Sequence, residues 1–214
     1  MSEQRRTLTV DQLAEFVRTG TGVLIRIADR LGPELADNWA NNGRTMEQAF
    51  FRALVPAGNK LIWRTIKLGT HKDTDSLRKA LESGGYDYYD AIDILVRPAF
   101  KVVEEERDIS LVVVSGKELG FTGYVALADI QKRALELGLE LCPAEVGPQL
   151  RLQYKEQPQG ENLNIAMEPI ADWDGSLYFF RVENEGSKPL LASRDAGPSY
   201  SWDSKFLWVF VSHK

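Results

Sequence analysis

The chain has 214 residues, of which 43% are apolar and 27% are charged, a composition typical of folded globular proteins that argues against extensive disorder. Its 26 Lys and Arg face 31 Asp and Glu, so the net charge is −5. That balance disfavours a protein whose whole surface binds polyanions, although it is compatible with a local basic patch.

Metal, disulfide and membrane chemistry have few residues to use. Cys142 is the only cysteine, which excludes an intramolecular disulfide, and His71 and His213 are the only histidines. We expect no metal site and no cofactor. Glu140 and Glu145 would raise the pKa of Cys142, which predicts a buried, inert thiol. The sequence has neither a signal-peptide pattern nor an apolar run of about 18 residues, so we expect a soluble cytoplasmic protein without membrane contact.

The first 56 residues are predicted to form a small helical region. Helical apolar spacing occurs at residues 9–20, 23–31 and 45–54, and each pattern ends at a glycine or a proline. Ala57, Gly58 and Asn59 then break the pattern. We therefore place a boundary near residue 56, with an α+β domain over residues 57–214; one continuous domain is the alternative.

The middle of the chain contains both strand-like and helix-like spacing of apolar residues. Alternation in LIWRTIKLG (61–69) predicts a strand, and FKVVEEERDISLVVVSG (100–116) predicts two strands around a charged turn. Helices are predicted for TDSLRKALES (74–83), which is followed by two glycines, for YDYYDAIDILV (86–96) and for residues 125–137.

From Pro148 onward, the chain alternates short apolar runs with turns. The predicted strands are PQLRLQY (148–154), NLNIAMEPI (162–170), SLYFFRVEN (176–184) and KFLWVFVSH (205–213). The last of these is apolar on both faces, which predicts a central, covered strand. The predicted fold class is therefore α+β, with a helical N-terminal region, a mixed segment and a C-terminal, mainly antiparallel β-sheet.

Two segments resemble ligand-binding loops but lack required residues. In LVVVSGKELG (111–120), Leu111 stands where a phosphate loop needs glycine, and Glu118 stands where it needs Ser or Thr. Asp172 and Asp174 resemble the start of a calcium loop, but Arg181 stands where the final glutamate belongs. We interpret the first segment as a strand that ends in a turn, and DWDG (172–175) as a hairpin turn.

Residues 60–79 show the clearest charge asymmetry, with six Lys and Arg against two Asp. Lys67, His71 and Lys72 lie where a predicted strand passes through a loop into a helix, a place where helix amides and basic side chains can hold an anion. This segment predicts a nucleic-acid or phosphate-ligand site, with His71 as a weak catalytic candidate. The alternative is that these are solvated charges and that His71 has no chemical task.

Aromatic residues are dense in the C-terminal region, and Trp173, Tyr200 and Trp202 fall in predicted turns. Exposed aromatic rings are typical of contact surfaces, whereas buried ones belong to the core. Our first functional hypothesis is a binding or interaction protein that uses these turns to hold a protein partner or a small ligand. The alternative is the nucleic-acid or phosphate-acting protein centred on His71. No residue pattern indicates a specific reaction.

Overall fold

The computed structural model describes residues 62–185 and 188–212. In chain order its elements are β1 (Arg64–Leu68), α4 (Thr74–Ser83), η1 (Tyr89–Ala91), α5 (Ile92–Leu95), β2 (Arg107–Ser115), β3 (Tyr124–Ala126), α6 (Leu127–Glu136), β4 (Leu139–Glu140), α7 (Val146–Gln153), β5 (Asn162–Ile165), β6 (Ile170–Ala171), β7 (Leu177–Glu183), β8 (Leu190–Asp195), β9 (Ser201–Asp203) and β10 (Leu207–Ser212). Three earlier predictions concern residues that the structure does not describe: the helices of residues 1–56, the boundary near residue 56, and Lys60, the first basic residue of the segment 60–79.

The predicted fold class is wrong in its layout. The described part is mixed α+β with a mostly sheet core, and α4 to α7 lie between strands of that core in the chain. No described residue supports a helical N-terminal region. The sheet is not confined to the C-terminal part either, because β1 and β2 belong to it. Local periodicity did not reveal these pairings, since they join segments that are far apart in sequence.

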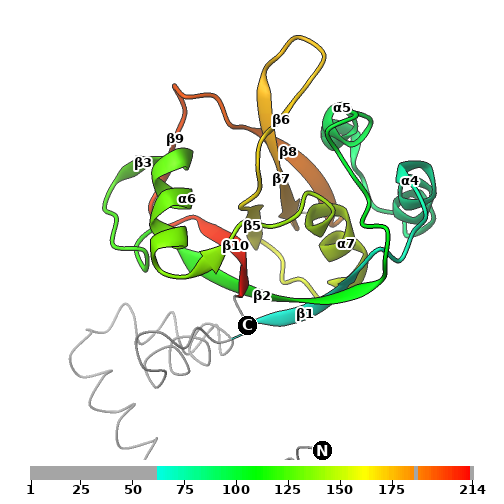
Figure 1. The fold of residues 1–214 in the computed structure, drawn as a ribbon, viewed down its shortest axis with the longest axis horizontal. Helices are drawn as coiled ribbons and strands as arrows, with labels where there is room; N and C mark the ends of the chain where they lie inside the picture. Colours follow the sequence, from blue (N-terminus) through cyan, green and yellow to red (C-terminus); the bar gives the residue numbers. More distant parts are fainter. Residues whose placement is uncertain (1–61, 186–187, 213–214) are drawn as a thin grey trace, which may run out of the picture. The chain divides into compact units, whose positions relative to one another are not determined.

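Eight of the described strands form one sheet, in the order β1-β2-β10-β5-β7-β6, with β4 also paired to β10 and β8 to β7. The pair of β10 and β5 is parallel, and the other pairs are antiparallel. β10 thus lies between β2 and β5, and Trp208, Val209 and Phe210 are fully buried. This confirms the prediction of a central, covered last strand (Figure 1).

Several local predictions are confirmed. α4 begins at a capping box, in which the Ser76 amide donates to Asp73 Oδ1 (2.8 Å) and the Asp73 amide donates to Ser76 Oγ (3.2 Å). Leu77 and Leu81 of this helix are buried, as their spacing predicted. β1 and α6 also form where expected, with boundaries shorter than predicted.

Three other local predictions are wrong. The predicted strand at 148–154 lies mostly in helix α7, whose first turn accommodates Pro148 and whose Gly147 packs on Phe180. The predicted helix at 86–96 contains only the short η1 and α5. Residues 100–103 form no strand. In each case tertiary packing overrides a short apolar pattern, which suits a helix or a strand equally well.

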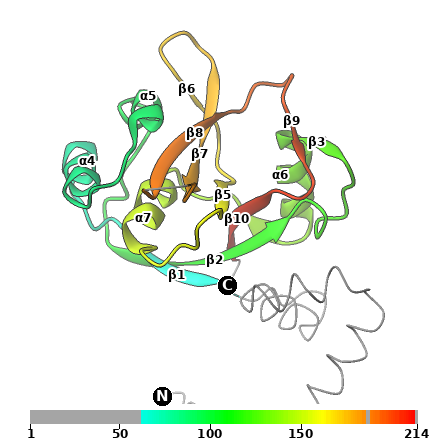
Figure 2. The same ribbon diagram turned by 180° about the vertical axis from the view of Figure 1, so that it is seen from behind.

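Alternate residues of β7 face the two layers that cover the sheet. The Phe180 ring packs 5.9 Å from Phe100 and lies against Gly147 of α7, whereas Phe179 packs 5.2 Å from Trp202. Figures 1 and 2 show α4, α5 and α7 gathered on one side, and α6 with the small sheet of β3 and β9 on the other. The core therefore lies on both faces of the sheet.

Candidate functional site

Two turns present exposed aromatic rings at the same end of the sheet. Strand pairing sets Tyr178 beside both Ile170 and Asp195, so the turn between β6 and β7 and the loop between β8 and β9 leave the sheet at the same end and then diverge (Figure 1). The first carries Trp173, which is 75% exposed, and the second carries Tyr200, which is 51% exposed. The sequence predicted both turns but could not place them at the same end of the sheet.

Aspartate side chains hold both turns in shape. Asp172 Oδ1 accepts hydrogen bonds from the amides of Asp174 and Ser176, both at 3.0 Å, which confirms the predicted hairpin turn. In the other loop, Asp195 Oδ1 accepts from the Gly197 amide at 2.6 Å, and the Tyr200 amide donates to the Gly197 carbonyl at 3.0 Å. These bonds fix the backbone that carries the exposed rings.

The surroundings of these rings are acidic. Partial burial, together with the negative charges of Asp172, Asp195 and Asp174, raises the pKa of Tyr178. A cavity of about 290 Å³ adjoins this tyrosine. Its lining consists of Asp90, Asp93, Tyr178 and Ser193. We call Asp172, Trp173, Asp174, Tyr178, Asp195 and Tyr200 the acidic aromatic end.

Trp202, the third aromatic predicted to lie in a turn, packs inward from β9. It is half-buried, and its ring lies 5.2 Å from Phe179, 5.9 Å from Phe206 and 6.0 Å from Trp208. These edge-on contacts are the geometry that aromatic pairs prefer. Trp202 therefore anchors the strand that follows Tyr200, rather than presenting a free ring.

Lys67 and Lys72, the two lysines of the predicted basic site, lie beside carboxylates. Lys67 Nζ is 2.9 Å from Glu106 Oε1 and 3.3 Å from Asp108 Oδ1, and the hydrogen bond to Glu106, followed by that to Asp108, raises the pKa of Lys67. Lys72 Nζ is 3.7 Å from Asp73 Oδ2. The local excess of positive charge in the sequence is thus offset by acidic residues, some of them from another part of the chain.

His71 belongs to a string of hydrogen bonds between the loop after β1 and helix α7. Its Nδ1 is 2.9 Å from Thr70 Oγ1 and 3.4 Å from Gln149 Nε2. Gln149 Nε2 also donates to Glu145 Oε1 at 2.8 Å, and the buried Glu145 accepts from the Gly69 amide at 2.9 Å. This arrangement holds the loop against the helix, and a task in chemistry is not needed to explain it.

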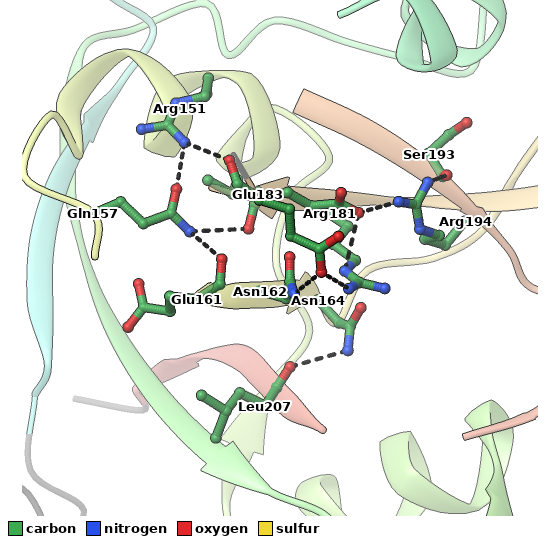
Figure 3. Close-up of polar contacts among 12 residues, drawn as sticks. Arg151, Gln157, Glu161, Asn162, Asn164, Arg181, Glu183, Ser193, Arg194 and Leu207 are labelled. Atoms are coloured by element: carbon green, nitrogen blue, oxygen red, sulfur yellow. Dashed lines mark hydrogen bonds and ion pairs between the residues drawn. The ribbon is translucent and has the colours of Figure 1, made fainter. Parts of the chain in front are cut away.

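Sequence reasoning missed a buried polar cluster on the face of β7 that is opposite to Phe180 (Figure 3). Arg181 and Glu183 are 8% and 3% exposed, and Arg194 on β8 donates to the same Glu183 oxygen that lies 3.1 Å from Arg181 Nε. The Arg181 contact is an ion pair without hydrogen-bond alignment. Burial lowers the pKa of Arg181 and raises that of Glu183.

A signal for this cluster exists in the sequence. Arg181 and Glu183 alternate with Phe180 and Val182 in a strand that is otherwise apolar, so both charges fall on one face. The cluster balances two arginines against Glu183 and the more distant Glu185, whose Oε1 is 3.8 Å from Arg181 Nη2. We interpret it as a structural network that joins β7 to β8.

Within 62–185 and 188–212, no group of three or more His, Cys, Asp or Glu is arranged to hold a metal ion. No helix in the same ranges has the length and apolar character needed to cross a membrane. Comparison of the chain with protein-family models, curated proteins and solved structures finds no match.

Proposed function

We propose that the protein is a binding protein whose acidic aromatic end contacts a positively charged segment of a protein partner. The observation that carries this proposal is the pair of exposed rings, Trp173 and Tyr200, on two turns that leave the same end of the sheet, with three aspartates near Tyr178 at that end. Large rings are the residues that most often dominate binding energy at protein interfaces. They also attract the ammonium and guanidinium groups of Lys and Arg through the ring face.

The charge around the rings determines the kind of partner. Asp172, Asp174 and Asp195 surround Tyr178, and Asp90 and Asp93 line the adjoining cavity. Complementary charge accelerates the encounter with a cationic segment and disfavours an anionic one. Nucleic acid is an unfavourable occupant of this surface, because its phosphates and the aspartates are both negatively charged.

The turns are also preorganised for contact. The hydrogen bonds made by Asp172 and Asp195 fix the two backbones before any partner arrives. A surface that is ordered in advance loses less conformational entropy on binding. Trp202 also contributes to this order, because it holds β9, the strand that follows Tyr200, against the aromatic core.

The alternative, a nucleic-acid or phosphate-acting protein centred on Lys67, His71 and Lys72, has less support. Both lysines lie within 4 Å of a carboxylate, and His71 is engaged by Thr70 and Gln149. An incoming phosphate would have to displace those partners. Binding of nucleic acid or phosphate at these residues would appear as an outcome of the binding experiment.

The test measures binding of fluorescent short peptides of cationic, neutral and anionic composition by anisotropy. We expect the wild-type protein to bind cationic peptides, and Trp173→Ala and Tyr200→Ala each to weaken binding about tenfold, which corresponds to about 1.4 kcal/mol. Tyr124→Ala is the matched control, since Tyr124 is 73% exposed on β3 but lies outside the acidic aromatic end.

Two results would overturn the proposal. One is equal loss of binding in Tyr124→Ala, which would show a nonspecific effect of removing a surface ring. The other is a preference for anionic peptides or oligonucleotides that disappears in a Lys67→Glu, Lys72→Glu double variant, which would support the basic segment instead.

A further inference from the structure

A second hollow lies between the end of α4 and the start of α5. It has a volume of about 300 Å³ and is lined by Arg78, Tyr86, Asp87, Tyr88 and Ile92. The volume is at the lower end of the range for small-molecule sites. This hollow shares no lining residue with the cavity at the acidic aromatic end.

Tyr86 is held as a fixed wall of the hollow. The Arg151 guanidinium lies 4.9 Å from the centre of the Tyr86 ring, and Arg151 is itself fully buried. On another side Gly84 allows close approach, because a Cβ at that position would lie 2.7 Å from Tyr86 Cε2. A ring packed in this way presents the same surface with and without a ligand.

Tyr88 and Asp87 are also oriented. The Tyr88 hydroxyl donates to the Glu82 carboxylate, and this bond, followed by partial burial, raises the pKa of Tyr88. The Asp87 carbonyl accepts from the Leu191 amide at 2.8 Å, which ties the segment to β8. Two aromatic side chains and the backbone of Asp87 are thus held around the same space.

Arg78 supplies hydrogen-bond donors to this space. Its Nη1 is 3.7 Å from Asp75 Oδ1, a loose and exposed contact. Because that contact is loose, the Arg78 guanidinium can donate to an oxygen of a ligand in the hollow that it lines.

We propose that this hollow binds a sugar ring. The lining offers guanidinium donors, carboxylate acceptors and aromatic surface, and the hydroxyl groups of a sugar both donate and accept hydrogen bonds. The face of the sugar ring that carries its C–H bonds packs against the tyrosines. One positive and one negative side chain line the hollow, so a neutral ligand fits its charge better than a phosphate does.

The test is saturation-transfer NMR with glucose, galactose, mannose, N-acetylglucosamine and ribose, and with inorganic phosphate as the anionic comparison. We expect transfer to at least one sugar and none to phosphate. Binding should weaken at least tenfold in Arg78→Gln and in Asp87→Asn. Lys79→Gln is the control, because Lys79 is the exposed neighbour of Arg78 on α4 and does not line the hollow.

A second measurement avoids dependence on variant folding. In the isotope-labelled wild-type protein, sugar addition should shift the NMR signals of Tyr86, Tyr88 and Ile92 and leave that of Trp173 in place. The proposal is overturned if none of the five sugars binds, if the shifts occur elsewhere, or if folded Arg78→Gln binds as the wild type does. Phosphate binding that is lost in Arg78→Gln would also overturn it, in favour of an anion site.

Discussion

Cys142 shows how burial controls the reactivity of a single side chain. The thiol is buried and donates to the Val209 carbonyl at 3.3 Å, and burial raises its pKa. This confirms the prediction of a buried thiol. Since the thiolate is the nucleophile, we expect Cys142 to resist alkylation at mildly alkaline pH in the folded protein and to react readily in denaturant. Mass spectrometry checks this, and rapid modification of the folded protein would contradict it.

Trp173 and Trp202 differ in what they contribute. Trp202 contacts three other rings, so we expect Trp202→Ala to lower the free energy of unfolding by about 3 kcal/mol. Trp173 projects into solvent, and Trp173→Ala should change the same quantity by less than about 0.5 kcal/mol. Urea denaturation of both variants measures the difference. Equal losses would mean that Trp173 is packed against the protein and is not a free ring of the proposed contact surface.

At the scale of elements, helix α7 closes the open edge of β1. Gln153 Oε1 accepts from the Lys67 amide at 2.9 Å, and Gln153 Nε2 donates to the Lys67 carbonyl at 2.8 Å. One side-chain amide thus makes the two bonds that a neighbouring strand would make. It also protects an edge that could otherwise pair with another chain.

This pairing predicts the effect of Gln153→Leu. Loss of two hydrogen bonds should lower the free energy of unfolding by about 2 kcal/mol and accelerate hydrogen exchange at the Lys67 amide. Gln159→Leu is the control, because Gln159 is exposed in the segment after α7. Unchanged protection of Lys67 in Gln153→Leu would show that the amide is shielded by other means.

At the scale of the whole molecule, the charge network of β7 and β8 lies where strands from the last third of the chain meet. Glu183→Gln would leave Arg181 and Arg194 without their shared carboxylate, so we expect a loss of about 3 kcal/mol in the free energy of unfolding. Glu185→Gln should cost less than about 0.5 kcal/mol, because that side chain is 56% exposed. Urea denaturation compares the two, and similar small losses would contradict a structural role for Glu183.

The predictability of the elements follows the strength of their local signals. α4 was predictable because Asp73, Leu77 and Gly84 mark its cap, its buried face and its end within a dozen residues. α7 was not, because Leu150 and Leu152 alternate as in a strand while the helix is buried on nearly all sides. In a short apolar run, tertiary packing can override the local helical or strand periodicity.

The predictability of the candidate site divides in the same way. Trp173 and Tyr200 could be assigned to turns from the residues around them, and the DWDG turn forms as expected. Their placement at one end of the sheet required the pairing of β7 with both β6 and β8. The pairing of Lys67 with Glu106 and Asp108 likewise depends on the register of β1 against β2, so counting charges along the chain overstated the basic patch.

The sequence by itself therefore determined the helix α4, the covered strand β10, the hairpin turn at 172–175 and the buried thiol. Each depends on nearby residues or on simple apolar character. Only the tertiary structure decided that β10 separates β2 from β5, that Trp202 points inward and that two aromatic turns share one acidic end. These features arise from contacts between segments far apart in the chain, whose free energy depends on the whole packed core.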